Sequence, residues 1–256
     1  MSFREQFKKT TTLKFDRVFE HQPIELVDIE AEMTDKGRVY VTPQGKRYPS
    51  VTTVLSLNSK DSIAKWRKRV GEEEANRISS TAANRGTRIH NLCEDYVNNK
   101  FQTGEKQFQA NPADHASFTP IQGILDRHVG KIFAVEAPLY SDFLRTAGRT
   151  DLIAEWDDEP AVIDFKTSRK KKELAYVQNY FQQGACYCSM WEERTGMPIK
   201  KFVIIISVDG DAPQVFIEQR DSYLPAFKKT RLAYKQAYLV WKNPWTLSYP
   251  LLQHYS

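Results

Sequence analysis

Two aspartates and a lysine stand at the edges of short apolar runs in the middle of the chain. Asp151 begins one run, and Asp164 and Lys166 end the next. Such runs are typical of strands, in which an acid without a partner is costly. Residues two apart on a strand point to the same face, and a turn at residues 157–160 would bring Asp151 beside the other two. Two carboxylates and an ammonium at one strand end can hold Mg²⁺ or Mn²⁺ and keep a cation beside a scissile phosphate.

An ordinary ion pair on an edge strand is the alternative interpretation of Asp164 and Lys166. An Asp-x-Lys triplet by itself does not exclude it. The context favours catalysis, because Gly148 precedes Asp151 by three positions and a short turn separates the two acids. A pattern of this kind remains a hypothesis until its structural setting is known.

The segment resembles the core of the PD-(D/E)XK nucleases, in particular the RecB-like branch. In that superfamily two acids and a lysine lie on a β-hairpin, and Asp151, Asp164 and Lys166 match them. Thr150 replaces the proline of the family name, but RecB-like members usually have Gly-x-x-Asp, which begins here at Gly148. The resemblance implies an α/β fold with a central mixed sheet flanked by helices. It also implies that Lys166 stabilises developing negative charge or helps to deprotonate the attacking water.

A histidine in a helical stretch upstream is a further candidate ligand. His90 and Glu94 are four residues apart and share a helix face. A neutral imidazole can bind Mn²⁺, and a carboxylate bonded to it would fix its tautomer; the alternative is a histidine that bonds Glu94 without any metal. RecB-like nucleases often have a Gly-Thr-x-x-His helix, which Gly86, Thr87 and His90 match. The metal ligands that the resemblance implies are His90, Asp151, Asp164 and the carbonyl oxygen of Phe165, with Mg²⁺ or Mn²⁺ as cofactor.

Polar groups on two further elements are candidates for contacts around the site. Gln183 and Tyr187 match the Gln-x-x-x-Tyr signature of the family and would bind phosphate or DNA. A plain polar helix face is the alternative, and Gln178 and Gln182 form a competing pair. Glu136 resembles an acid often found on the strand before Asp151, where it would lie near the metal or simply face solvent.

Basic residues flank these motifs and could bind phosphates. The run Arg169–Lys172 directly follows the site, although it could equally be a solvated helix start. The other candidates for substrate contacts are Arg85, Thr167 and Ser168, with Tyr48, Trp66, Arg67 and Arg69 along the path of a strand.

The remaining sequence predicts a helical N-terminal half followed by an αβββαβ core. We expect an arm at residues 1–36 that orders on a partner, a hairpin and helical part at 37–130, and a nuclease core at 131–256, with 37–256 as one compact unit. The expected elements are a hairpin at 37–48; helices at 61–69, 120–128, 173–195 and 222–241, with one or two more at 72–100; and strands at 132–141, 145–156, 161–167, 201–208 and 214–219.

Composition limits the protein class only loosely. The 256 residues are 41% hydrophobic, enough for a core, and the net charge of +5 permits polyanion binding. No apolar run approaches the ~18 residues of a membrane span, and residues 1–17 lack the apolar stretch of a secretory signal. Three cysteines are too few for a disulfide framework. We expect the cytoplasm, of a host cell if the protein is viral, with the mitochondrion as the alternative.

The motifs together span most of the chain, from Val39 to Tyr187. Within the RecB-like branch, residues 48–55 and 66–72 are most similar to the mitochondrial genome-maintenance exonucleases and their bacteriophage relatives. This resemblance implies a Mg²⁺- or Mn²⁺-dependent exonuclease that digests single-stranded DNA from a free end. The alternatives are a structure- or sequence-specific endonuclease of the same fold and a non-catalytic DNA-binding module.

Overall fold

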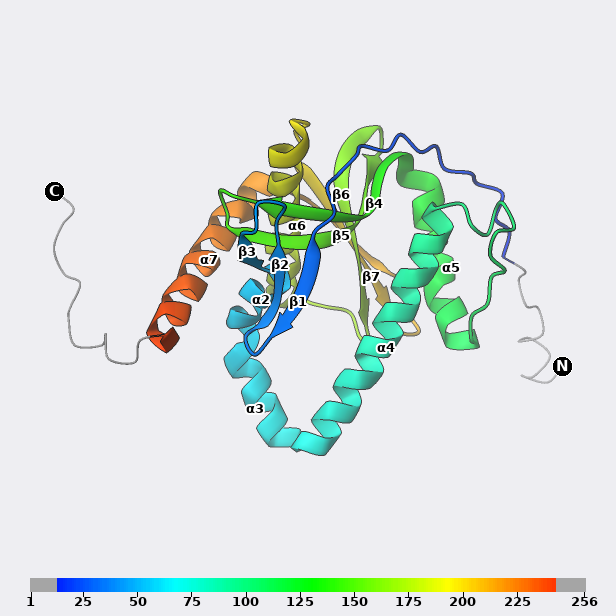
Figure 1. Ribbon diagram of the computed structural model, residues 1–256. Coiled ribbons are helices and arrows are strands. Elements are labelled where there is room, and N and C mark those ends of the chain that lie inside the picture. The colour runs from blue at the N-terminus through cyan, green and yellow to red at the C-terminus, as the bar shows by residue number, and fades with distance from the viewer. Residues whose placement is uncertain (1–12, 243–256) are drawn as a thin grey trace.

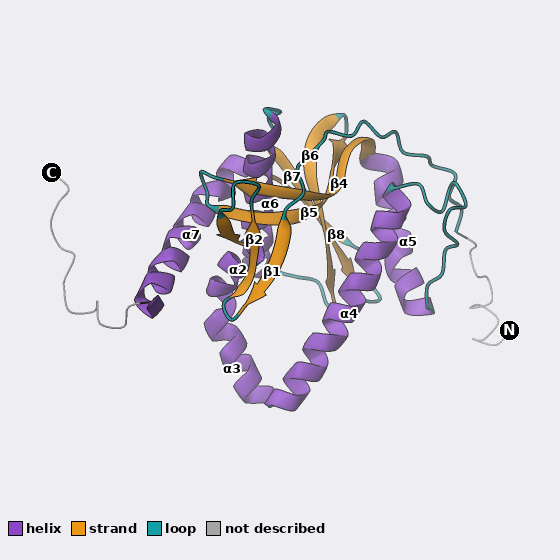
Figure 2. Ribbon diagram, in the orientation of Figure 1, coloured by secondary structure: helices purple, strands orange, loops and turns teal. Residues whose placement is uncertain are grey.

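A five-stranded sheet forms the centre of the protein in a computed structural model that describes residues 13–242, with side chains as far as residue 237. The strand order is β4-β5-β6-β7-β8 (Figures 1 and 2). β6 and β7 are parallel and the other neighbours are antiparallel. Helix α6 makes the crossover that a parallel pair requires. The sheet is therefore mixed, as predicted, and its strands are β4 (Val129–Ser141), β5 (Thr146–Trp156), β6 (Glu159–Ser168), β7 (Lys201–Val208) and β8 (Gln214–Gln219).

Helices cover both faces of this sheet, which explains the uninterrupted apolar sequence of β7. Phe202, Ile204 and Ile206 pack in one core cluster with helices α2, α6 and α7. Val203 and Ile205 point the other way, into a cluster with α4 and α5. A strand buried on both faces needs apolar residues at every position. The helices are α2 (Val51–Leu55), α4 (Glu72–Val97), α5 (Pro112–His128), α6 (Leu174–Thr195) and α7 (Arg220–Lys242).

A smaller antiparallel sheet precedes the core. Its strands are β1 (Glu30–Thr34), β2 (Gly37–Val41) and β3 (Arg47–Pro49). The last two form the hairpin expected at residues 37–48, whereas β1 was not predicted. Tyr40 and Tyr48 pack with Ile29 against the β4–β5 end of the large sheet. The small sheet is thus fixed to the core.

Residues 13–36, the described part of the N-terminal arm, are ordered by contacts within the protein. We expected this arm to become ordered on a partner. It runs beside β4, where the amide of Ile132 donates to the carbonyl of Glu20 (2.8 Å) and the amide of Ile24 donates to the carbonyl of Phe133 (3.0 Å). Phe19 is buried in the core cluster with α4 and α5, and Ile29 is buried with Tyr40 and Tyr48. Intramolecular pairing and burial therefore order it; residues 1–12 of the predicted arm lie outside the described residues.

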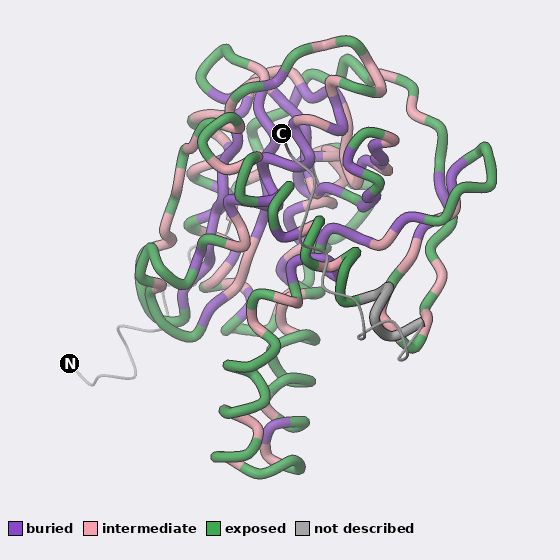
Figure 3. Tube along the Cα trace, turned by 90° about the vertical axis from the view of Figure 1, so that its left-hand side faces the viewer, coloured by how far each residue is buried: buried purple, intermediate pink, exposed green. Residues whose placement is uncertain are grey.

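Helix α3 and the N-terminal half of α4 form a largely exposed V that projects from the body of the molecule (Figures 1 and 3), whereas the C-terminal half of α4 packs on the core. α3 spans Lys60–Val70 after a short 3₁₀ turn, η1 (Ser56–Ser59). Gly71 joins the two helices with φ +87°, a backbone conformation that side chains rarely adopt. Both helices were predicted from the sequence, and the sharp turn between them follows from this glycine.

Helix α5 begins eight residues earlier than predicted and contains Pro120 inside it. Its start is determined by Asn111, whose side chain accepts from the amide of Asp114 at 2.9 Å, followed by Pro112 at the first helical position. A proline inside a helix costs about 3 kcal/mol. Burial of Phe118, Ile121 and Leu125 on one face offsets that cost. Among the described residues, no helix is both long and apolar enough to cross a membrane.

Candidate active site

The β5–β6 hairpin brings Asp151 next to Asp164 and Lys166. Leu152 pairs with Ile163 across the hairpin, and the turn is made by Asp157 and Asp158, both with positive φ. The amide of Phe165 donates to Oδ2 of Asp151 at 2.7 Å. The hairpin expected from the spacing of the two acids is therefore present, and it holds the Asp151 carboxylate against the backbone of β6.

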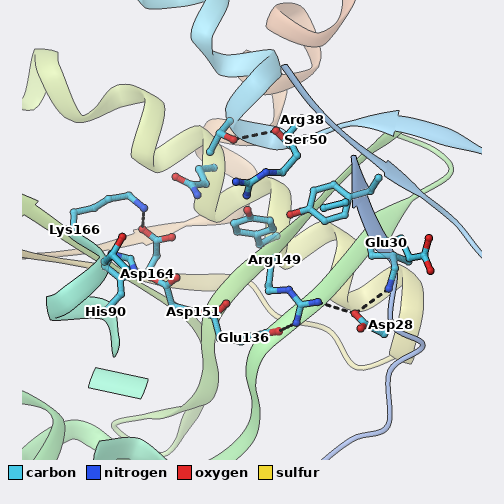
Figure 4. A pocket seen from close by; sticks show the side chains of 18 of the residues that line it. Asp28, Glu30, Arg38, Ser50, His90, Glu136, Arg149, Asp151, Asp164 and Lys166 are labelled. Carbon is cyan, nitrogen blue, oxygen red and sulfur yellow. Dashed lines mark hydrogen bonds and ion pairs between the residues drawn. The ribbon is translucent and has the colours of Figure 1, made fainter. Parts of the chain in front are cut away.

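Asp164 and Lys166 form an ion pair at the end of β6 (Figure 4). Asp164 is only 1% exposed. Burial raises the pKa of Asp164 to about 6; the charge of Asp151 adds to this desolvation, and the two together outweigh the attraction of Lys166. Burial lowers the pKa of Lys166, but the two aspartates outweigh it and the net pKa is raised. The two acidic neighbours therefore favour the ammonium form of Lys166.

His90 reaches this pair from helix α4. Its Nδ1 lies 3.4 Å from Oδ1 of Asp151, and its ring meets Phe165 edge-on at 6.2 Å between centroids. Burial lowers the pKa of His90, yet the hydrogen bond and charge of Asp151 raise it overall. The pKa of Asp151 is lowered in spite of its burial, chiefly by His90. The partner of His90 is thus Asp151, and the predicted pairing with Glu94 is not formed.

Glu136 is a third carboxyl group near the aspartates. It lies on β4 with φ +49° and lines the same cavity as Asp151 and Asp164. Burial raises its pKa to about 7, with further contributions from the charges of Asp151 and Glu94. Glu94 itself does not line the cavity. Of the two interpretations left open for Glu136, the structure supports the one that places it beside the aspartates.

Helix α6 presents Gln183 and Tyr187 to the cavity. Tyr187 packs so tightly on β5 that a Cβ added at Gly148 would lie 2.7 Å from its hydroxyl oxygen. The glycine of Gly-x-x-Asp and the tyrosine of Gln-x-x-x-Tyr therefore meet. Gln182 instead accepts from the Thr230 hydroxyl on α7 at 3.1 Å, and Gln178 donates to the carbonyl of Leu174. Packing thus selects Gln183 as the glutamine at the site.

The cavity that these residues share has a volume of about 890 Å³. Its walls come from β4, β5, β6, α4 and α6 and, on the far side, from the small N-terminal sheet (Figure 4). Sequence reasoning missed four charged residues of this wall, Asp28, Glu30, Arg38 and Arg149. Arg149 donates to Oδ1 of Asp28 and to the carbonyl of Glu136, each at 2.7 Å. No local pattern marks these residues, because they meet only after the small sheet has docked on the core.

Arg85, Thr167 and Ser168 lie outside the cavity, in an adjoining groove of about 1070 Å³. Arg85 forms an ion pair with Asp209 at 2.5 Å, and the Ser168 hydroxyl donates to the carbonyl of Lys170 at 2.6 Å. The groove also contains Arg77, Tyr176 and the basic run Arg169–Lys172. The prediction that places Tyr48 along a DNA path is wrong, since this side chain is buried and donates to Asp142 at 2.7 Å. Trp66, Arg67 and Arg69 lie on the projecting helix α3.

The donor set fits a hard divalent cation. Within residues 13–242, no three His, Cys, Asp or Glu side chains are close enough to hold a metal by themselves. However, carboxylate oxygens are the preferred ligands of Mg²⁺ and Mn²⁺, and backbone carbonyls and water complete such sites. The buried Oδ2 of Asp164 contacts Lys166 but accepts no hydrogen bond of good geometry. A cation held by Asp151 and Asp164 would offset the desolvation and the charge repulsion that raise the Asp164 pKa.

A mixed α/β sheet that presents two carboxylates and a lysine on one hairpin is the arrangement of a nuclease. Residues 61–239 match the family model described as the PD-(D/E)XK nuclease superfamily. This match covers more than half of the chain, so the chain belongs to the PD-(D/E)XK nuclease superfamily. Members of this family act on DNA and typically use divalent metal ions.

Two crystal structures are similar to this chain at low sequence identity. One is a protein from Eubacterium rectale named "Putative exonuclease", at 17% identity over 69% of this chain and 77% of that chain, with a TM-score of 0.42. The other, SSO0001, is 17% identical over 57% of this chain and 71% of that chain, with a TM-score of 0.30. Superpositions this loose add nothing to the family assignment. No curated protein matches the chain.

Proposed function

We propose that the protein is a metal-dependent exonuclease that hydrolyses single-stranded DNA from a free end. The observation that supports it best is the convergence of Asp151, Asp164, Lys166 and His90 at one edge of a large polar cavity. Neither a purely structural ion pair nor a DNA-binding module requires all four groups. A divalent ion held by Asp151, Asp164 and the carbonyl of Phe165 would supply an activated water and neutralise charge on the phosphate.

The surrounding side chains orient these groups and stabilise charge. Asp151 is held at Oδ2 by the Phe165 amide and at Oδ1 by His90, so its carboxylate has one orientation. Lys166 contacts Asp164 at the same strand end, where it would stabilise the negative charge that develops on the phosphate or help to deprotonate the attacking water.

The shape and charge around the site support a single strand as substrate. The cavity is walled by the small sheet, α4, α6 and the core, which leaves room for a short unpaired segment. The adjoining groove places Arg85 and Arg169–Lys172 where they would bind the phosphates of a continuing strand. Residues close together in the chain line the two spaces: Thr87 and Lys166 line the cavity, and Arg85 and Thr167 line the groove.

A time course on 5′- and 3′-labelled oligonucleotides, single- and double-stranded, with Mg²⁺ or Mn²⁺ tests this proposal. We expect stepwise shortening of single strands and no cut in a closed circle of single-stranded DNA. Cleavage of the circle would show that the protein is an endonuclease of the same fold and not an exonuclease. Binding without cleavage under every metal condition would leave only a DNA-binding module.

A further inference from the structure

Arg38 extends into the catalytic cavity from strand β2 of the small sheet (Figure 4). The other cationic side chains of the cavity wall all have acidic partners: Arg149 with Asp28, Lys166 with Asp164 and His90 with Asp151. Among the described residues, Arg38 lies within ion-pair distance of no carboxylate. A guanidinium that lines a cavity of acids without pairing with one is available to an anion that enters the cavity.

The backbone of Arg38 is held in place by the start of helix α2. Its carbonyl oxygen accepts from the amide of Ser50 (2.8 Å) and from the hydroxyl of Thr53 (3.2 Å). Ser50 also caps α2, since its hydroxyl oxygen accepts from the Thr53 amide. Gly37 fits against Thr53 with φ +111°, and a Cβ there would lie 2.7 Å from the threonine hydroxyl. The side chain of Arg38 therefore leaves from a fixed point, which lowers the entropy lost when it binds a ligand.

We propose that Arg38 binds a backbone phosphate of the DNA strand adjacent to the scissile phosphate. The small N-terminal sheet is then a part of the substrate site and not only a cover for the core. This inference rests on the proposed function, because the strand that Arg38 contacts is the one to be cut. A planar guanidinium binds phosphate oxygens in pairs, which gives both affinity and a fixed register.

Arg47 provides a matched control on the same sheet. It lies on β3, forms an ion pair with Glu32 and does not line the cavity. Arg38→Gln and Arg47→Gln therefore remove the same charge from the same sheet. Thermal melting of both variants shows whether each remains folded, and Arg38→Lys retains the charge but not the paired geometry.

The first measurement is the affinity of each protein for fluorescent oligo(dT), determined by anisotropy in a buffer with Ca²⁺ at several salt concentrations. Loss of one phosphate contact from a single strand reduces the slope of log K against log salt by about 0.7. We expect this reduction and a roughly 10-fold weaker affinity in Arg38→Gln, and neither change in Arg47→Gln. The same slope in Arg38→Gln as in the parent overturns the proposal.

The second measurement locates the contact. A series of oligonucleotides is used, each with one neutral methylphosphonate at a different position. The parent protein binds an oligonucleotide more weakly wherever the replaced phosphate is one that it contacts. Arg38→Gln is expected to lose this sensitivity at one position next to the cleaved bond, whereas equal sensitivity at every position overturns the inference. If the parent does not cleave at all, the proposed function fails, while the salt slope still decides whether Arg38 contacts phosphate.

Discussion

Gly148→Ala tests the contact between the two motifs that meet behind the active site. The added Cβ would lie 2.7 Å from Oη and 2.8 Å from Cε1 of Tyr187, whereas ordinary contacts begin at 3.4 Å. The tyrosine is 2% exposed although it lines the cavity, so a shift of its ring by the required distance must break the contacts that bury it. Overpacking of this kind costs about 1–3 kcal/mol. A loss of about 2 kcal/mol lowers the melting temperature by roughly 4–8 °C for a chain of this size.

The assay is thermal denaturation of the parent, Gly148→Ala and a control glycine variant. Gly123 lies on the exposed face of helix α5, and a Cβ there meets no atom within 4 Å. Gly123→Ala should therefore raise the melting temperature by roughly 2–4 °C, because alanine favours a helix over glycine by about 1 kcal/mol. The two alanine substitutions are expected to shift stability in opposite directions.

A double variant identifies Tyr187 as the cause. In a Tyr187→Ala background the ring is absent, so the further change Gly148→Ala should cost little. An undiminished cost in that background, or a Gly148→Ala protein that melts like the parent, would refute the packing argument. Gly148→Ala should also raise KM for DNA, because Tyr187 shares the cavity wall with Gln183.

Three further predictions concern the chemistry of the site. Lys166→Ala should abolish cleavage of single-stranded DNA while binding persists, with Lys200→Ala, an exposed lysine away from the cavity and the groove, as the control; equal cleavage by the two variants in a gel time course would exclude the role assigned to Lys166. Removal of divalent ions with EDTA should stop cleavage, and added Mg²⁺ or Mn²⁺ should restore it; activity that persists after exhaustive chelation would contradict a metal held by Asp151 and Asp164. Arg85→Ala should reduce the salt dependence of DNA binding by about 0.7 per lost phosphate contact, and an unchanged slope would leave Arg85 as only the partner of Asp209.

The core strands and the long helices could be predicted from the sequence because their signals are local. Alternating or continuous apolar runs define β4 to β8, and the turn at Asp157 and Asp158 joins two of them. Helix α5 could not be predicted correctly from Pro120, since a proline normally ends a helix. The side-chain cap of Asn111 and the burial of Phe118 against α4 and the sheet overcome that preference.

The residues of the candidate site also fall into those that local sequence spacing predicts and those that tertiary packing selects. Asp151, Asp164 and Lys166 lie on one hairpin, so their spacing alone predicts that they converge. Gln183 could not be distinguished from Gln182 by periodicity, because both positions fit a polar helix face. The packing of α7, which gives Gln182 a partner in Thr230, makes the distinction.

The sequence by itself determined the hairpin of two acids and a lysine, the helix that bears His90, and the resemblance to a nuclease family. Only the tertiary structure decided what surrounds them. Arg38 and Asp28 reach the cavity because a small sheet docks its tyrosines on the end of β4 and β5, far away in the chain. Such contacts depend on burial between distant segments, for which no short-range spacing exists in the sequence.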